Sequence, residues 1–298
     1  MVGALLLNAN NRVRLPCMSS QARIPLPVKP APIRMPTPHP NWASLQADIE
    51  AHLKQTIPIK EPLEVFEPMN HLPFAAPRTT VPALCLAACE LVGGQRRQAM
   101  AAASTLLLNL ANAHAHEHLP LTEGPGPRPR DGPEPMYGPN IELLTGDGLV
   151  PFGFELLARP DGAAGASPER VLRVIIEISR AVGSVGLQHA QYTKRRLLLE
   201  SDKEVHQHVE SMQRFVLEKR DGGLHACGAA CGAILGGGSE DQIERLRKFG
   251  FHVGMMRGML QRGFKEKHVK EERELALKEL QFFMDRDVDV HVISTFIY

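Results

Sequence analysis

Apolar side chains recur every three or four residues in segment after segment of this chain, a spacing that predicts amphipathic helices. The first such stripe consists of Trp42, Leu45, Ile49 and Leu53. Further helices are predicted at residues 82–110, 141–158, 168–186, 199–218, 222–236, 239–262 and 270–284. Strand-like sequence is confined to residues 288–296, and the proline- and glycine-rich residues 124–140 are predicted to form a loop. Aromatic residues make up only 5% of the chain, which disfavours a β-sandwich or barrel, so we predict an all-α bundle.

The first 47 residues contain no aspartate or glutamate, and they carry five basic residues. The basic residues are Arg12, Arg14, Arg23, Lys29 and Arg34. Residues 24–40 also hold seven prolines and no apolar face to bury, so this segment is predicted to be disordered. An acid-free leader that carries arginines is typical of an organelle transit peptide, and an untargeted proline-rich tail is the alternative. We therefore predict a leader over residues 1–41 and one all-α domain over residues 42–298.

The overall charge and the cysteine content exclude several classes of protein. The 34 basic and 33 acidic residues give a formal net charge of +1, which argues against a nucleic-acid-binding protein or a polybasic membrane anchor. No stretch approaches 18 uninterrupted apolar residues, so no transmembrane helix is predicted. Five cysteines in 298 residues are too few for a small secreted domain held together by disulfides.

Two C-x-x-x-C motifs lie inside predicted helices. They consist of Cys85 with Cys89 and of Cys227 with Cys231. A spacing of four places both thiols of a motif on one helix face, and the surrounding alanines and glycines favour close packing against another helix. An interface role, a role as buried small apolar residues and a four-cysteine zinc site all fit this pattern. A disulfide within one motif is disfavoured by its required torsion angle.

Two further features have simple structural interpretations. His114, His116 and His118 form a cluster with Glu117. His114 and His118 share a helix face and could ligate a metal, but we favour a solvated helix end followed by a loop, because no partnered ligands are evident. The three glycines at residues 236–238 are predicted to end one helix before Ser239 caps the next, which is simpler than a phosphate-binding loop.

Four stretches of the chain resemble segments of the plant trans-prenyltransferases. They are residues 83–94, residues 116–120, residues 144–149, and residues 232–239 followed by 246–249. The similarity runs in order over about residues 42–262. The paired C-x-x-x-C motifs narrow the resemblance to the small subunits of heteromeric geranyl or geranylgeranyl diphosphate synthases, a group that includes the geranylgeranyl diphosphate synthase recruiting proteins. The resemblance implies an isoprenyl diphosphate synthase-like helical bundle.

The family that the chain resembles uses two aspartate-rich motifs to hold magnesium, because hard divalent cations bind clustered carboxylates. The first motif corresponds to Glu117, His118 and Glu123 in this chain. The second corresponds to residues 261–265, whose former aspartate positions hold Gln261, Arg262 and Lys265. Cations and an amide therefore replace the carboxylates of the second motif.

The family's contacts to diphosphate are replaced as well. Its Gly-Gly-Lys-Arg-x-Arg-Pro segment corresponds to residues 76–82, which retain only Arg78 as a cation. Its Lys-Thr and Phe-Gln pairs correspond to Arg220 with Asp221 and to Arg257 with Gly258. Stabilisation of a departing diphosphate is largely electrostatic, so the isolated chain is expected to be inactive.

The resemblance therefore predicts a non-catalytic regulatory subunit in plastids. Its expected partner is a catalytic geranylgeranyl diphosphate synthase large subunit, whose activity or product length (geranyl or geranylgeranyl diphosphate) it would modulate. The resemblance implies that Cys85, Cys89, Cys227 and Cys231 form or support that pairing. We expect no cofactor in this chain and Mg²⁺ in the catalytic partner. The alternatives are an active trans-prenyltransferase with degenerate metal motifs and a four-cysteine zinc or redox module on a helical scaffold.

Overall fold

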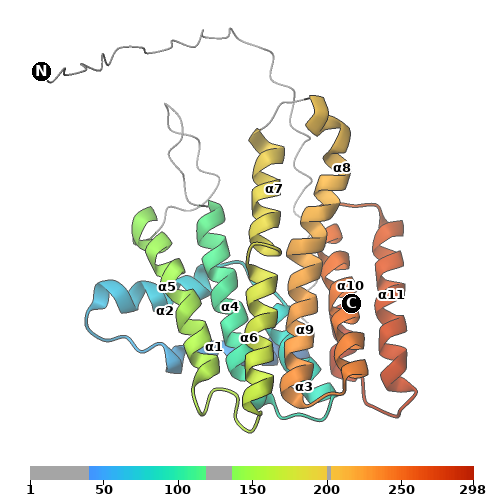
Figure 1. The fold of residues 1–298 in the computed structure, drawn as a ribbon, viewed down its shortest axis with the longest axis horizontal. Helices are drawn as coiled ribbons and strands as arrows, with labels where there is room; N and C mark the ends of the chain where they lie inside the picture. The colour runs from blue at the N-terminus through green and yellow to red at the C-terminus, as the bar shows by residue number, and fades with distance from the viewer. Residues whose placement is uncertain (1–39, 119–135, 200–202) are drawn as a thin grey trace, which may run out of the picture. The chain divides into compact units, whose positions relative to one another are not determined.

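The structure of the chain is a computed structural model that describes residues 40–118, 136–199 and 203–298. These residues form helices joined by turns, with no strand among them, which confirms the predicted all-α class (Figure 1). The helices in chain order are α1 (Pro40–Thr56), α2 (Leu63–Ala75), α3 (Val81–Leu91), α4 (Arg96–His118), α5 (Pro139–Ala158), α6 (Pro168–Val182), α7 (Leu187–Leu199), α8 (Lys203–Leu217), a π-helical segment (Glu218–Gly222), α9 (Gly223–Gly236), α10 (Glu240–Gln261), α11 (Glu266–Met284), α12 (His291–Ser294) and a final 3-10 turn (Thr295–Ile297). No helix in these ranges combines the length and the apolar character that crossing a membrane requires.

Helices α3 and α9 form the centre of the fold. Every residue of α3 from Val81 to Cys89 is buried, and so is every residue of α9 from Leu224 to Leu235. Figure 1 shows α9 between α6 and α10, and α9 also packs directly against α3. A helix that is apolar on all sides is stable only when other helices surround it, so α9 lies at the centre of the bundle.

Glycines let the backbone of α9 approach both α3 and α10. A Cβ atom added at Gly232 would lie 1.9 Å from the carbonyl oxygen of Cys85 on α3. A Cβ atom added at Gly254 of α10 would lie 2.1 Å from the carbonyl oxygen of Asp221, just before α9. The glycines involved repeat every four residues, at Gly228, Gly232 and Gly236 on α9 and at Gly250, Gly254 and Gly258 on α10. A larger residue at Gly228, Gly232, Gly236, Gly250 or Gly254 would meet backbone atoms within 3 Å, so it would not fit without moving a helix, whereas at Gly258 it would meet only side chains.

The turn between α9 and α10 follows the prediction from the glycine triplet. Gly237 adopts a left-handed backbone conformation with a φ of 85°, which glycine adopts without strain. Ser239 then begins α10 with a capping box: its Oγ accepts from the Gln242 N–H, and its own N–H donates to Gln242 Oε1.

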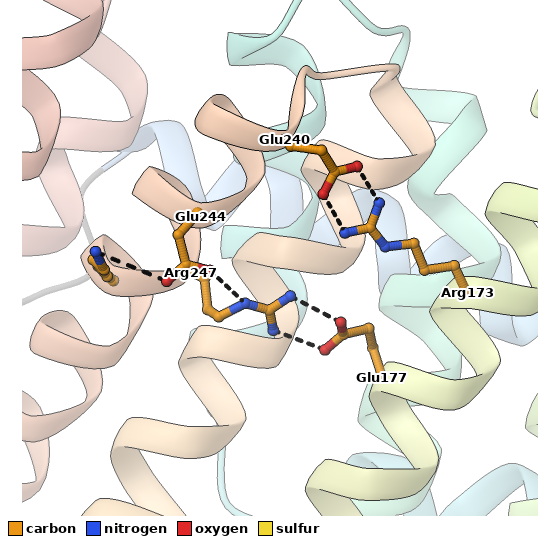
Figure 2. Close-up of polar contacts among 6 residues, drawn as sticks. Arg173, Glu177, Glu240, Glu244 and Arg247 are labelled. Carbon is orange, nitrogen blue, oxygen red and sulfur yellow. Dashed lines mark hydrogen bonds and ion pairs between the residues drawn. The ribbon is translucent and has the colours of Figure 1, made fainter.

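Two arginine–glutamate pairs hold α6 against α10 (Figure 2). Both guanidinium Nη atoms of Arg173 donate to Glu240, at 2.5 and 2.8 Å. Those of Arg247 donate to Glu177 at 2.7 and 2.8 Å, and Arg247 Nε lies 3.3 Å from Glu244. Because Arg173 and Glu177 lie one turn apart on α6, the two bidentate pairs fix the rotation of α6 about its own axis.

The predicted helix over residues 82–110 is wrong, because the structure has two helices there. Helix α3 ends at Leu91 and α4 begins at Arg96. Gly93 between them has a φ of 87°, and a Cβ atom added at Gly94 would lie 2.5 Å from the Cα atom of Gly236. The chain leaves the helix here because the turn must pass close to the end of α9.

Two helices were absent from the sequence prediction. Helix α2 contains Pro68 and Pro73, which argue against a helix in the sequence. Helix α7 lies in the gap between the predicted segments 168–186 and 199–218, and α6 ends before it at Val182. The strand-like sequence of residues 288–296 does not form a strand. Residues 291–297 form α12 and the 3-10 turn, and apolar residues there such as Phe296 are buried.

The glycine contacts generate a stability prediction. We expect Gly232→Ala to lower the free energy of unfolding by about 3 kcal/mol or more, because α3 and α9 must separate. That loss corresponds to a fall in Tm of roughly 6–12 °C. Gly148 of α5 is exposed with no atom within 4 Å of an added Cβ, so Gly148→Ala is the matched control. It should stabilise the protein by about 0.5–1 kcal/mol through helix propensity. Equal effects of the two substitutions in thermal melts would contradict the packing argument.

Candidate functional site

The carboxylate that remains at the first metal-motif position is held between two cations. Glu117, in the last turn of α4, accepts hydrogen bonds from Lys194 of α7 and from Arg220 Nη1 of the π-helical segment, the latter at 2.9 Å. Its side chain is only 14% exposed. Burial raises the pKa of Glu117, but the charge of Arg220 and the hydrogen bond from Lys194 outweigh it and lower the pKa to about 2. Glu117 is therefore ionised, and its charge is already neutralised within the chain.

The second motif position is joined to the same region by another ion pair. Arg262 follows the last residue of α10, and its Nη2 atom lies 2.9 Å from Asp221 Oδ2. Its Nη1 atom donates to the carbonyl oxygen of Gly258 at 2.9 Å. Burial raises the pKa of Asp221 above its ordinary value, and the charges of Arg262 and Arg220 offset part of this rise. The π-helical segment thus connects the ends of α4 and α10 through alternating charges.

The described residues at the two motif positions do not fit a magnesium ion. Gln261 and Lys265 are exposed, Arg262 is a cation, and Glu117 already accepts from two cations. His118 ends α4, and Glu123 lies outside the described residues. Over the described ranges no group of three or more His, Cys, Asp or Glu side chains is arranged to hold a metal. Magnesium binds several carboxylate oxygens that are free to coordinate it, and this donor set does not supply them.

The positions that correspond to the family's diphosphate contacts are also used for other interactions. Arg78 is 79% exposed and lies 3.7 Å from Glu50. Arg257 is buried with its guanidinium over the Trp42 ring, 4.7 Å from the ring centroid. Burial lowers the pKa of Arg257 to about 10, so it remains charged at neutral pH. Arg257, which corresponds to the first residue of the family's Phe-Gln pair, is therefore a cation packed on an aromatic ring.

A buried histidine joins α9 to the start of α3. His225 Nδ1 lies 2.7 Å from the carbonyl oxygen of Asp221, and Nε2 lies 3.0 Å from Thr80 Oγ1. Burial lowers the pKa of His225 to about 4, so the ring is neutral at physiological pH. The neutral ring donates from Nδ1 to the carbonyl and accepts the Thr80 hydroxyl at Nε2. In the predicted histidine cluster, His116 Nε2 instead lies 2.7 Å from Asp147 Oδ1 of α5.

The four cysteines of the C-x-x-x-C motifs lie in the interior, at the contact between α3 and α9. Cys85, Cys89 and Cys231 are 0% exposed and Cys227 is 3% exposed. All four are free, and the Sγ atoms of Cys227 and Cys231 are 3.8 Å apart. Burial raises the pKa of Cys89 to about 12, and burial also raises the pKa of Cys85 well above its ordinary value. Within this chain the thiols pack as small apolar groups, and none of them lies on the surface.

Sequence reasoning missed Lys194, one of the two cations that neutralise Glu117. Lys194 lies on α7, a helix that the apolar pattern did not predict. The run Lys194-Arg195-Arg196 is the only signal in the sequence that pointed to a cation here. The sequence also did not predict the ion pair between Asp221 and Arg262, because this pair depends on how closely α10 approaches the π-helical segment at Gly258.

The lowered pKa of Glu117 predicts a pH-dependent contribution to stability. Since the folded-state pKa lies below the ordinary value of 4.5, the contribution is complete above pH 4.5 and is lost as pH falls toward 2. We expect Glu117→Gln to cost about 3 kcal/mol at pH 7 and about 2 kcal/mol at pH 3.5. Urea unfolding across this range measures the difference from the wild type. Glu155, 59% exposed and paired with Arg159, provides the control Glu155→Gln, which should change stability by less than about 1 kcal/mol. A cost for Glu117→Gln that does not vary with pH would contradict the ion-pair interpretation.

The buried thiols predict different effects of serine and alanine. Replacing Cys227 and Cys231 by serine places two hydroxyls in an apolar contact, at a cost of about 1–3 kcal/mol for each unsatisfied group. Alanine should cost less, because it leaves only a small void. Urea unfolding of both double variants, with and without a chelator, measures this. Equal losses for serine and alanine, reproduced by the chelator in the wild type, would instead indicate a zinc site.

Comparisons with known proteins agree with this geometry. No family model matches the chain. The small subunit 2 of the heterodimeric geranylgeranyl pyrophosphate synthase of Cannabis sativa, named chloroplastic, is 47% identical over 259 residues, which are 83% of this chain and 88% of the relative. The solved geranyl diphosphate synthase small subunit of Antirrhinum majus is 47% identical, with a TM-score of 0.72 over 86% of this chain and 95% of that one. A deletion mutant of the mint heterotetrameric geranyl pyrophosphate synthase, solved with ligands, contains a chain that is 44% identical, with a TM-score of 0.72 over 87% of this chain and 99% of that one.

The helical fold is that of the isoprenyl diphosphate synthases. The chain belongs to the family of small subunits of plant heteromeric geranyl and geranylgeranyl diphosphate synthases. Relatives named chloroplastic confirm the predicted plastid location.

Proposed function

We propose that the chain is a non-catalytic subunit that binds a catalytic geranylgeranyl diphosphate synthase in plastids and changes its rate or its product length. Relatives of the chain are named as small subunits of heterodimeric synthases, and the mint enzyme is described as heterotetrameric. These names support a role in a complex with a large subunit.

The neutralisation of Glu117 carries the non-catalytic part of the proposal. An allylic diphosphate leaves only when its negative charge is balanced, and the family achieves this with magnesium on clustered carboxylates. In this chain Lys194 and Arg220 balance Glu117, and Arg262 balances Asp221. Among the described residues, the carboxylates Glu117 and Asp221 are thus held in ion pairs within the chain.

The leader supports the plastid part of the proposal. Residues 1–39 lie outside the described residues, so the transit peptide rests on the acid-free, arginine-bearing composition of the sequence. The magnesium ions required for turnover are assigned to the catalytic partner.

The two alternatives have less support. An active trans-prenyltransferase would need magnesium ligands beyond Glu117 and Glu123, and the second motif offers an amide and two cations. A four-cysteine zinc or redox module would need thiols arranged to hold a metal, and the described cysteines form no such group.

A prenyltransferase assay tests the proposal. With Mg²⁺, isopentenyl diphosphate and an allylic diphosphate, the chain alone should make no product above background. Mixed with a plastid geranylgeranyl diphosphate synthase, it should change the rate or the product length of that enzyme. Turnover by the chain alone at the rate of a homodimeric synthase would overturn the non-catalytic assignment, and an unaltered partner enzyme would overturn the regulatory one.

A restoration variant provides the control for this assay. Replacing Gln261, Arg262 and Lys265 together by aspartate should not create activity, because Glu117 remains neutralised and Thr79 and Val81 leave the diphosphate contacts incomplete. Activity in this triple variant would mean that the second motif alone had been missing.

A further inference from the structure

A hollow lies where the end of α1, the start of α2 and the last two turns of α5 meet. Its volume is about 770 Å³, and it is open to solvent on one side. That size falls within the range of roughly 300–1,000 Å³ that is typical of small-molecule sites. None of the residues in the ion pairs of Glu117 and Asp221 lines the hollow, so it is separate from the site at those ion pairs.

Apolar side chains form the floor of the hollow. Phe66 and Met69 of α2 and Phe152 of α5 line it, and all three are only partly buried. Met69 and Phe152 also pack against the hydrophobic core, which holds them in place. Apolar surface that remains in contact with water is favourably covered by an apolar ligand. The floor therefore fits the hydrocarbon part of a ligand.

Two cations lie beside the aromatic rings of this floor. Lys60 Nζ lies 4.6 Å from the centre of the Phe66 ring, and Arg159 Cζ lies 5.9 Å from the centre of the Phe152 ring. Arg159 Nη2 also donates to Glu155 Oε1 at 2.6 Å, whereas Lys60 takes part in none of the ion pairs found among the described residues. The wall of the hollow thus carries two cations and one carboxylate, which leaves an excess of positive charge.

A histidine in the same wall adds no charge. His52 Nδ1 lies 2.9 Å from Ser104 Oγ. Burial lowers the pKa of His52, and the charge of Asp161 offsets part of that fall, so the ring is neutral at pH 7. Lys60 and Arg159 are therefore the cations that a ligand in the hollow would meet.

We propose that the hollow binds an elongated apolar molecule that carries a small anionic head group. The chain of that molecule lies on Phe66, Met69 and Phe152, and its head lies at Lys60 and Arg159, beside the same rings. A free inorganic anion would leave the apolar floor in water, and an uncharged hydrocarbon would leave the positive charge unbalanced. A phosphate ester of a long alcohol and a long-chain carboxylate share the required chemistry.

Binding measurements on the full chain, without a catalytic subunit, test this proposal. Geranylgeranyl diphosphate and palmitate, each kept below the concentration at which it forms micelles, are the two amphiphilic probes. Geranylgeraniol supplies a chain without charge, and inorganic pyrophosphate supplies charge without a chain. We expect at least one amphiphile to bind about tenfold or more tightly than either of these, and the tighter amphiphile identifies the head group.

Matched variants locate the binding in the hollow. Lys60→Glu should raise the Kd of the bound amphiphile about tenfold or more, because attraction becomes repulsion. Lys54 also lies over a ring, 5.4 Å from the centre of Phe74, but it does not line the hollow, so Lys54→Glu should change the Kd less than about threefold. Gln55 is exposed and lines the hollow. Gln55→Trp should fill the hollow and raise the Kd about tenfold or more, whereas Gln55→Ala should change it less than about threefold.

Three results would overturn the assignment. They are no binding of either amphiphile by the folded wild type, equal affinity for geranylgeraniol or pyrophosphate, and wild-type affinity in both Lys60→Glu and Gln55→Trp. The substituted residues are exposed, so the variants should fold, and thermal melts verify this. If Gln55→Trp does not fold, the comparison of Lys60→Glu with Lys54→Glu decides alone.

The binding proposal goes beyond the proposed function and does not depend on it, because the hollow belongs to this chain alone. A negative binding result leaves the regulatory function standing. Failure of that function in the prenyltransferase assay likewise leaves the ligand site standing, since the binding measurements contain no catalytic subunit.

Discussion

Backbone packing at the glycines of α9 and α10 brings three helices closer together than larger residues would allow. Gly232 lies against the carbonyl of Cys85, and Gly254 against that of Asp221. The close packing of these helices encloses the cysteines and brings Arg262 next to Asp221. It also places α10 near enough to α6 for Glu240 and Arg247 to form ion pairs with it. The same close contact therefore determines both the interior of the bundle and the orientation of its outer helix.

The candidate site is held together by ion pairs within the chain. At the ends of α4 and α10, Glu117 lies between Lys194 and Arg220, and Asp221 lies beside Arg262. Cations supplied by the chain itself balance these carboxylates. Such pairs hold the ends of the helices together and leave few free carboxylate oxygens for a metal. The proposed loss of activity and the proposed structural role thus follow from the same substitutions.

Sequence reasoning predicted the helical class, the capped start of α10 at Ser239 and the family, because these depend on local patterns and motifs. It failed where tertiary packing decides the local structure. The turn at Gly93 exists because Gly94 must pass Gly236. Ile293 and Phe296 are apolar because they are buried in a short helical segment, and they do not belong to a strand. Lys194 could not be assigned to Glu117, since α7 itself was not predicted. The C-x-x-x-C spacing predicted that the cysteines pack against another helix, but only the fold shows that they are buried on all sides.

Hydrogen–deuterium exchange on the free chain and on its complex with a plastid geranylgeranyl diphosphate synthase tests most directly whether the cysteine helices α3 and α9 are an internal scaffold or part of the contact with the partner. Helices α3 and α9 should already exchange slowly in the free chain and should change little. Rapid exchange of α3 and α9 in the free chain, followed by their protection in the complex, would contradict this account.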